Sequence, residues 1–243
     1  MMVEIGAFAR ANGLFLLSDE TYREIVFDGP SAPSALTIPG LEDYVVVIDS
    51  LSKRFNVCGA RIGSLVSRNP RIMAMALELA ELRLAVPAVE QHVASAALAT
   101  PRAYLDDLVR AYQRRVSVVA DGLAQAHGVR VSRPDGAFYV VAELPVDDSE
   151  RFAAWLLSDF SLDDETVMVT PMGDFYATPG RGVNEIRVAC IVNEVELYRA
   201  TSILRAGLDR YPCTAKQHER IARLSLPAAR DRAIPFVGTD MPE

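Results

Sequence analysis

The apolar and polar residues along the chain follow two different periods. Continuous apolar runs at residues 14–17 and 45–48 are typical of strands buried on both faces, and residues 62–66 are a third strand candidate. The first two runs each end in an aspartate and a serine, and the segment between them is rich in proline and glycine. Such a segment predicts a crossover with little regular structure. We therefore expect an α/β sheet in which the first two strands are parallel.

Helical patterns lie around and after these strands. Residues 4–12 before Gly13, residues 71–85 before Pro87 and residues 87–99 each predict a helix. Thr100 and Pro101 form a cap and first-turn pair for a long helix that ends by Gly128. Its apolar positions recur every three or four residues. These are Tyr104, Leu108, Tyr112, Val116, Val119 and Leu123.

After Gly128 the pattern becomes α+β. Short apolar runs predict strands at 129–131, 137–142, 167–169 and 185–190. Longer periodic segments predict helices at 151–158 and 194–208, and a weaker one at 216–224.

Composition narrows the class of protein. The chain has 243 residues, half of them hydrophobic, so a sizeable core is expected. The net charge of −7 disfavours a nucleic-acid partner or an anionic membrane surface. The cysteines Cys58, Cys190 and Cys213 form no CxxC pair, which predicts a reducing compartment without zinc or disulfides. No apolar run reaches the roughly 20 residues of a membrane span, so we expect a cytoplasmic protein.

Reactive side chains follow the first two predicted strands. In an open α/β sheet, ligands bind beyond the carboxyl ends of parallel strands. Asp19, Tyr22 and Lys53 fall at that edge, and Ser50 and Arg61 offer the hydroxyl and the cation that a phosphate needs. A lysine, an aspartate, a tyrosine and a phosphate site are the groups that pyridoxal 5'-phosphate requires.

Four segments together resemble a known family. They are DETY (19–22), SLSK followed by CGARIG (50–63), PDGAFYV (134–140) and NEIRVAC (184–190). In this order and spacing they resemble class I/II aminotransferases of fold type I, the aspartate-aminotransferase type, over roughly residues 1–209. The resemblance implies part of a large cofactor-binding domain with a mainly parallel sheet at 1–100. It also implies a small α+β domain at 101–210 that begins with the long helix, and a C-terminal extension at 211–243.

The resemblance also gives roles to individual residues of the cofactor site. Lys53 would form an imine with the cofactor and later move a proton at the substrate. Asp19 would keep the ring nitrogen protonated, and Tyr22 would donate a hydrogen bond to the phenolic oxygen. Ser50 and Arg61 would hold the phosphate.

The same resemblance implies that Arg187 binds the substrate α-carboxylate through two parallel hydrogen bonds. Taken alone, each residue has a plainer interpretation: Lys53 as a solvated loop lysine, Asp19 as a turn former, Arg187 as an edge-strand arginine. Their joint occurrence in this order favours the family.

The function implied is transfer of an amino group between an amino acid and a 2-oxo acid, by a homodimer. Two alternatives stay open: a lyase or decarboxylase of the same fold, which shares the cofactor residues, and a non-catalytic remnant or regulatory protein.

In this family the large domain begins well before the strand that carries the aspartate, whereas 18 residues precede Asp19 here. We therefore expect a chain that lacks the N-terminal part of the family, and that is inactive and poorly soluble when expressed alone.

Overall fold

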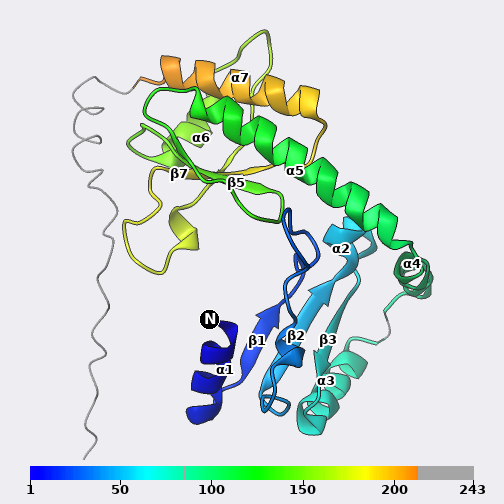
Figure 1. Cartoon of the computed structure of the whole chain (residues 1–243). Coiled ribbons are helices and arrows are strands. Elements are labelled where there is room, and N and C mark those ends of the chain that lie inside the picture. Colours follow the sequence, from blue (N-terminus) through cyan, green and yellow to red (C-terminus); the bar gives the residue numbers. More distant parts are fainter. Residues whose placement is uncertain (85, 213–243) are drawn as a thin grey trace, which may run out of the picture. The chain divides into compact units, whose positions relative to one another are not determined.

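The structure is a computed structural model that describes residues 1–84 and 86–212, so Cys213 and the helix expected at 216–224 lie outside the described residues. The chain divides into two compact units, each treated by itself (Figure 1). The N-terminal unit comprises Met1–Val118, Arg133–Val140 and Ala189–Leu197. The C-terminal unit comprises Val119–Ser132, Val141–Val188 and the described residues from Tyr198 onward.

A three-stranded sheet organises the N-terminal unit, in the order β1 (Leu16–Asp19), β2 (Val45–Ser50) and β3 (Gly63–Ser67). β1 and β2 are parallel, with Asp19 opposite Ile48, while β3 runs antiparallel to β2. The predicted parallel pair is therefore confirmed. As a result, the polar residues that end β1 and β2 lie together at the carboxyl ends of these strands, which form one edge of the sheet.

One face of this sheet is well packed. Leu41, Val45 and Val47 form a buried cluster with Ala35 of η1 (Ala35–Thr37), and Met2 of α1 (Met2–Ala11) packs against it. The first half of β2 is therefore buried in an apolar cluster, whereas its second half, from Ile48 onward, is more exposed.

The prediction that residues 14–17 form a strand buried on both faces is wrong. The strand begins two residues later, and Leu14, Phe15 and Leu17 are 49%, 56% and 63% exposed. Phe15 and Leu17 line an apolar hollow of about 480 Å³ together with Leu65 of β3 and Met75 of α3 (Pro70–Leu82). A continuous apolar run shows that its side chains are hydrophobic, but it does not show whether other residues of this chain pack over them.

Two of the remaining helices of the first half follow the predicted pattern, α4 (Ala88–Leu98) and the long α5 (Arg102–Ala124). The short helical turns α2 (Leu51–Arg54) and η2 (Cys58–Ala60) were not predicted. α3 begins after Asn69, whose side chain accepts hydrogen bonds from the backbone N–H groups of Arg71 and Ile72. It ends three residues earlier than expected because Leu84 adopts a positive φ of 64°, which a right-handed helix does not accommodate.

A second sheet has the strand order β4 (Arg130–Val131), β5 (Tyr139–Glu143), β7 (Glu185–Ala189) and β6 (Thr170–Pro171). Along it lie α6 (Ser149–Ser158), η3 (Gly173–Phe175) and α7 (Glu194–Arg210). The C-terminal unit is built around the buried side chains of Ala142, Leu144, Phe152, Leu156, Ile186 and Leu204.

One strand of the second sheet lies at a different place from the one that the sequence predicts. The strand expected at 167–169 is wrong, because Thr170 and Pro171 pair instead with Arg187 and Ile186. Within the C-terminal unit, α5 and α7 approach closely at Gly122, where an added Cβ would lie 2.6 Å from Oγ1 of Thr201. Along the described residues, no helix combines the length and the apolar character needed to cross a bilayer.

Gly63 offers a test of the close approach of β3 to β2. It lies opposite Ser50, and a Cβ at this position would lie 2.5 Å from the backbone oxygen of Asp49. Backbone atoms cannot move aside as a flexible side chain can. We expect Gly63→Ala to lower the free energy of unfolding by about 1–3 kcal/mol, measured by urea denaturation. Gly59→Ala is the control, since no atom lies within 4 Å of its added Cβ. Equal losses in the two variants would contradict the expected clash.

Candidate functional site

The turn after β1 is held by its own side chains. Asp19 ends the strand, and its Oδ1 accepts hydrogen bonds from the N–H and the hydroxyl of Thr21, at 3.1 and 2.6 Å. The buried Glu20 accepts from the hydroxyl of Ser34 at 3.0 Å and from the N–H of Ala35 at 2.8 Å. These bonds fix the path of the loop that leads from Asp19 to Tyr22.

Tyr22 lies against an aromatic cluster that includes two residues of the PDGAFYV segment, Phe138 and Tyr139. Its ring meets that of Phe138 edge-on, with centroids 5.3 Å apart, and its hydroxyl lies 3.0 Å from the hydroxyl of Tyr139. The Nζ of Lys53 lies 5.6 Å from the centroid of the same Phe138 ring. The buried Phe138 therefore contacts two of the predicted site residues. Phe138 was not itself predicted as a site residue, although it belongs to one of the four motifs.

The PDGAFYV segment lies directly beside the DETY loop. Val26 pairs with Gly136, the N–H of Phe27 donates to the oxygen of Asp135, and the N–H of Ala137 donates to the oxygen of Ile25. A hollow of about 450 Å³ lies here, and its lining includes Asp19, Tyr22 and Asp135. Two motifs more than 100 residues apart in the sequence thus lie next to each other in the N-terminal unit.

Lys53 lies in the single helical turn that follows β2. Ser50 is the N-cap of this turn: its Oγ accepts from the N–H of Ser52 at 3.2 Å and donates to the Ser52 hydroxyl at 2.9 Å. The lysine side chain is partly buried. The strand and its cap therefore set the position of Lys53 without an intervening loop.

Arg61 adopts a left-handed backbone conformation, with φ 49° and ψ 42°. Its side chain is exposed, and Nη1 donates to the carbonyl oxygen of Cys58 at 3.1 Å. A non-glycine residue in this region is uncommon and marks a position that its surroundings impose. Arg61 lies two residues before Gly63, which pairs with Ser50, so it belongs to the same edge of the sheet.

Arg187 lies on β7 in the C-terminal unit, opposite Thr170 of β6. Its guanidinium carbon lies 4.7 Å from the ring centroid of Phe175, which belongs to η3. Such a cation–π contact orients the flat guanidinium group. Phe175 was not predicted from the sequence, because nothing in the local pattern pairs it with a strand residue twelve positions later.

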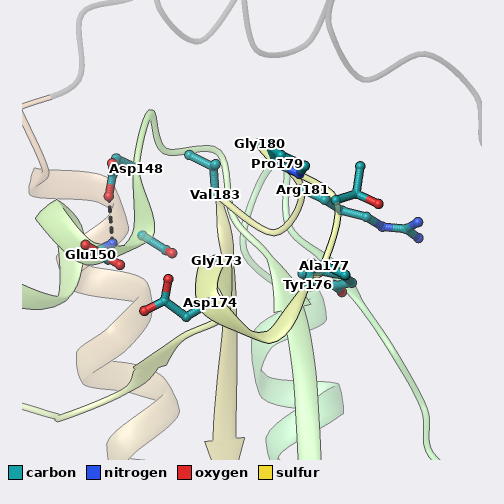
Figure 2. A pocket seen from close by; sticks show the side chains of 12 residues that line it. Asp148, Glu150, Gly173, Asp174, Tyr176, Ala177, Pro179, Gly180, Arg181 and Val183 are labelled. Atoms are coloured by element: carbon teal, nitrogen blue, oxygen red, sulfur yellow. Dashed lines mark hydrogen bonds between the residues drawn. The ribbon is translucent and has the colours of Figure 1, made fainter.

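A separate hollow of about 440 Å³ lies at the start of α6 in the C-terminal unit (Figure 2). Asp148 caps the helix by accepting from the N–H groups of Glu150 and Arg151. Figure 2 shows Arg181 extending away from Asp148 and Asp174. The polar groups of this hollow do not converge on a common point, so it is not part of the candidate site.

The pKa values of several side chains are shifted, among them those of Tyr112, Cys190 and Tyr176. Burial raises the pKa of Tyr112, whose hydroxyl donates to Asn56, and raises the pKa of Cys190 to about 12. The hydrogen bond to Glu185 raises the pKa of Tyr176. Neither Cys58 nor Cys190 forms a disulfide, and within the described ranges no cluster of His, Cys, Asp and Glu is arranged to hold a metal ion.

Residues 2–204 match the family model described as aminotransferase class I and II. The chain belongs to this family. Over 194 residues it is 34% identical to the LL-diaminopimelate aminotransferase of Natranaerobius thermophilus, an alignment that covers 79% of this chain and 48% of the relative. It is 30% identical to the glutamate-pyruvate aminotransferase AlaC of Escherichia coli, covering 84% of this chain and 48% of that protein.

The fold comparison agrees with this family assignment. A probable N-succinyldiaminopimelate aminotransferase from Thermus thermophilus superimposes with a TM-score of 0.71 at 27% identity, covering 85% of this chain and 53% of that structure. The predicted fold class, an α/β arrangement of the fold-type I aminotransferases, is thereby confirmed. This aminotransferase chain spans about half the length of the curated relatives it matches.

The structure brings five of the six predicted site residues to one edge of one sheet. Asp19 and Ser50 lie at or near the carboxyl ends of the parallel strands, and Tyr22 and Lys53 share a contact with Phe138. Arg61 lies in the connection that leads into β3, whose first residue, Gly63, pairs with Ser50 of β2. The sixth, Arg187, lies in the C-terminal unit. The functional roles of all six stay predictions.

Proposed function

We propose that this chain carries the catalytic lysine and the substrate clamp of a pyridoxal-phosphate-dependent aminotransferase. The reaction moves an amino group between an amino acid and a 2-oxo acid. One observation carries the proposal: Lys53 follows β2 within one helical turn, while the neighbouring parallel strand ends in Asp19. Membership in the class I and II aminotransferase family supports it.

The side chains of this edge fit the cofactor in chemical type and placement. The site offers one amine, Lys53, within one turn of the sheet edge, and one carboxylate, Asp19, at the end of the adjacent strand. Ser50 and Arg61 supply a hydroxyl and a guanidinium for a phosphate. When bound, pyridoxal 5'-phosphate supplies an electron sink for the bonds at the substrate Cα.

The residues around the ring have distinct tasks in this proposal. Lys53 would hold the cofactor through its amine, and the same amine would carry a proton at the reacting carbon of the substrate. The Asp19 carboxylate pairs with the ring nitrogen, and its bonds with Thr21 keep it in place. Tyr22 would donate a hydrogen bond from its hydroxyl to the phenolic oxygen of the cofactor. The neighbouring Tyr139 hydroxyl, 3.0 Å away, supports this orientation.

Arg187 binds the substrate α-carboxylate. Its planar guanidinium fits a carboxylate through two parallel N–H···O bonds, and the contact with Phe175 holds the plane of that group. Amino acids and 2-oxo acids share this carboxylate, so one clamp serves both halves of the reaction.

Relatives named for LL-diaminopimelate and for glutamate and pyruvate support amino acids and 2-oxo acids as the substrate class. The proposal includes a homodimer in the cytoplasm. It also keeps the division into a cofactor-binding part at 1–100, a small domain at 101–210 and an extension at 211–243.

The test is a half-reaction with the protein produced from its whole gene. Protein loaded with pyridoxal 5'-phosphate is mixed with single amino acids, among them glutamate, aspartate and alanine. We expect the absorbance of the pyridoxal form to fall while an equimolar 2-oxo acid is released, and a second 2-oxo acid to restore it. Steady release of ammonia or carbon dioxide without this exchange would show a lyase or a decarboxylase. No spectral change with any amino acid would contradict the proposal.

A further inference from the structure

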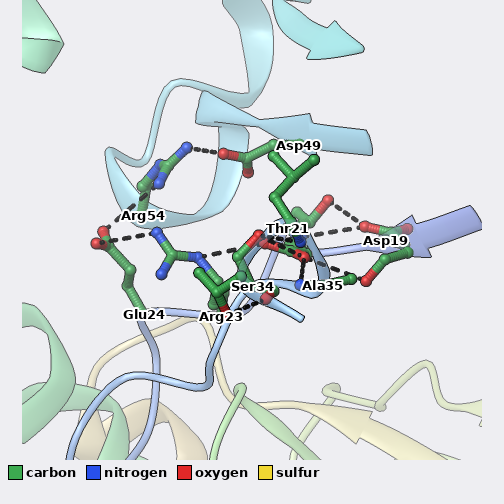
Figure 3. Close-up of polar contacts among 12 residues, drawn as sticks. Asp19, Thr21, Arg23, Glu24, Ser34, Ala35, Asp49 and Arg54 are labelled. Atoms are coloured by element: carbon green, nitrogen blue, oxygen red, sulfur yellow. Dashed lines mark hydrogen bonds and ion pairs between the residues drawn. The ribbon is translucent and has the colours of Figure 1, made fainter. Parts of the chain in front are cut away.

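Arg54, the residue after Lys53, ends α2 and is only 14% exposed. Its Nη2 forms an ion pair with Oδ2 of Asp49 on β2, and its Nη1 lies 3.6 Å from Oε2 of Glu24 (Figure 3). Glu24 lies in the loop after β1, so a single guanidinium group connects two different segments of the N-terminal unit. This contact was not visible in the sequence, where the two carboxylates are 25 positions apart.

The two segments are those that carry the proposed cofactor residues. Glu24 also lies 3.8 Å from Arg23, and Arg23 lies 3.5 Å from the buried Glu20, directly after Asp19. On the other side, Oδ1 of Asp49 accepts from the N–H of Ser50 at 2.7 Å. Charges of alternating sign therefore run from the loop of Asp19 and Tyr22 to the cap of the turn that holds Lys53.

The chemistry of an arginine suits this connection. The guanidinium presents donors in a flat fork and contacts two carboxylates at once through Nη1 and Nη2, whereas the ammonium of a lysine is a compact point charge without this fork. Asp49 and Glu24 are each 18% exposed. Removal of the arginine would leave Asp49 without this ion pair in a partly buried region, which is more costly than the loss of a surface pair. Glu24 would keep its contacts with Arg23 and with Arg102, whose Nη1 lies 3.7 Å from Oε1 of Glu24.

We infer that Arg54 is a positioning residue, which holds the turn of Lys53 against the loop of Asp19 and Tyr22. The inference rests on the proposed function in assigning Lys53 as the residue that binds the cofactor. The ion pairs of Arg54 with Asp49 and Glu24, called here the tie between the two loops, exist in the protein without cofactor and are tested separately.

Hydrogen exchange on the cofactor-free protein tests the tie. The amides of Arg23 and Ile25 report the first loop, since they donate to the oxygens of Glu20 and Tyr22, and the amide of Phe55 reports α2. We expect Arg54→Met to lower protection at all three amides by about tenfold or more. If this variant does not fold, Arg54→Lys replaces it. The matched control is Arg110→Met, at a 61% exposed arginine paired with Asp107 on the same helix. A loss of protection confined to Phe55 would overturn the inference.

Two forms of the cofactor separate positioning of Lys53 from general damage to the site. Pyridoxal 5'-phosphate bonds to the lysine, whereas pyridoxamine 5'-phosphate lacks the aldehyde and does not. Because a small misplacement of a reacting group costs up to about 100-fold, we expect Arg54→Lys to slow formation of the borohydride-reducible bond by about 10- to 100-fold. The Kd for pyridoxamine 5'-phosphate should change by less than about twofold.

The outcomes are distinguishable. Equal losses for both cofactors would overturn the positioning role, because Arg54 would then support the site as a whole. Failure of the unaltered protein to bind either cofactor would contradict the proposed function, while the exchange measurement would still decide whether Arg54 ties the loops.

Discussion

Replacement of Lys53 by alanine is expected to abolish transamination and to remove the borohydride-reducible bond to pyridoxal 5'-phosphate. A positioned proton carrier contributes about 10²–10⁴-fold to a rate, and the covalent attachment is lost as well. We expect kcat to fall by at least about 10⁴-fold. Binding of the cofactor itself should persist more weakly, through Ser50 and Arg61. Activity, absorbance after borohydride and equilibrium dialysis measure the three effects.

The chain offers a clean control, because it contains only two lysines, Lys53 and Lys216. Lys216→Arg should leave the rate and the adduct unchanged. Mass spectrometry of the reduced, digested protein should place the adduct on the peptide that carries Lys53. An adduct on Lys216 would show that the catalytic lysine has been misassigned.

The second large effect is expected for Arg187→Lys. The lysine keeps the positive charge but loses the planar fork, and with it one of two charge-assisted hydrogen bonds to the substrate carboxylate. Such a bond is worth about 1.5–3 kcal/mol, so KM for both the amino acid and the 2-oxo acid should rise about 10- to 150-fold. The absorbance of the bound cofactor should not change, because in the proposed role Arg187 contacts only the substrate.

Arg181→Lys is the matched control for the clamp. Arg181 belongs to the same unit and also lies over an aromatic ring, with its guanidinium carbon 5.1 Å from the centroid of Tyr176. Its substitution should leave KM unchanged. If both variants behave like the unaltered enzyme, Arg187 has a structural role in β7 and no part in substrate binding.

Much of the candidate site could be predicted from the sequence, because the positions of its residues depend on contacts between residues that are close in the sequence. The residues at the ends of two apolar runs are placed by strand direction alone, so the sequence is enough to assign Asp19 and Ser50 to one sheet edge. Lys53 follows Ser50 by less than one helical turn, which leaves little freedom for its position. The long helix could also be predicted, since Tyr112, Val116 and Leu123 recur at helical spacing and are buried.

The features that sequence did not predict depend on contacts between distant segments. Phe138 meets Lys53 and Tyr22 across more than 80 positions, and Arg54 meets Glu24 across a loop. Periodicity carries no information on such pairs. The exposed apolar side chains of β1 were misread for a related reason: the pattern identifies a face that can be buried, and only the packed structure shows which atoms lie on it.

The shortness of α2 has a consequence for how the gene can change. Each residue of an α-helix advances the chain by about 100° around the axis, so one inserted or deleted residue between Ser50 and Lys53 would swing the amine to another side of the site. The exposed stretch 28–30 faces no such constraint, since an added Cβ at Gly29 meets no atom within 4 Å and loops of this kind absorb insertions at little cost. Among descendants of this gene, insertions and deletions should therefore accumulate at residues 28–30 and be eliminated between Ser50 and Lys53.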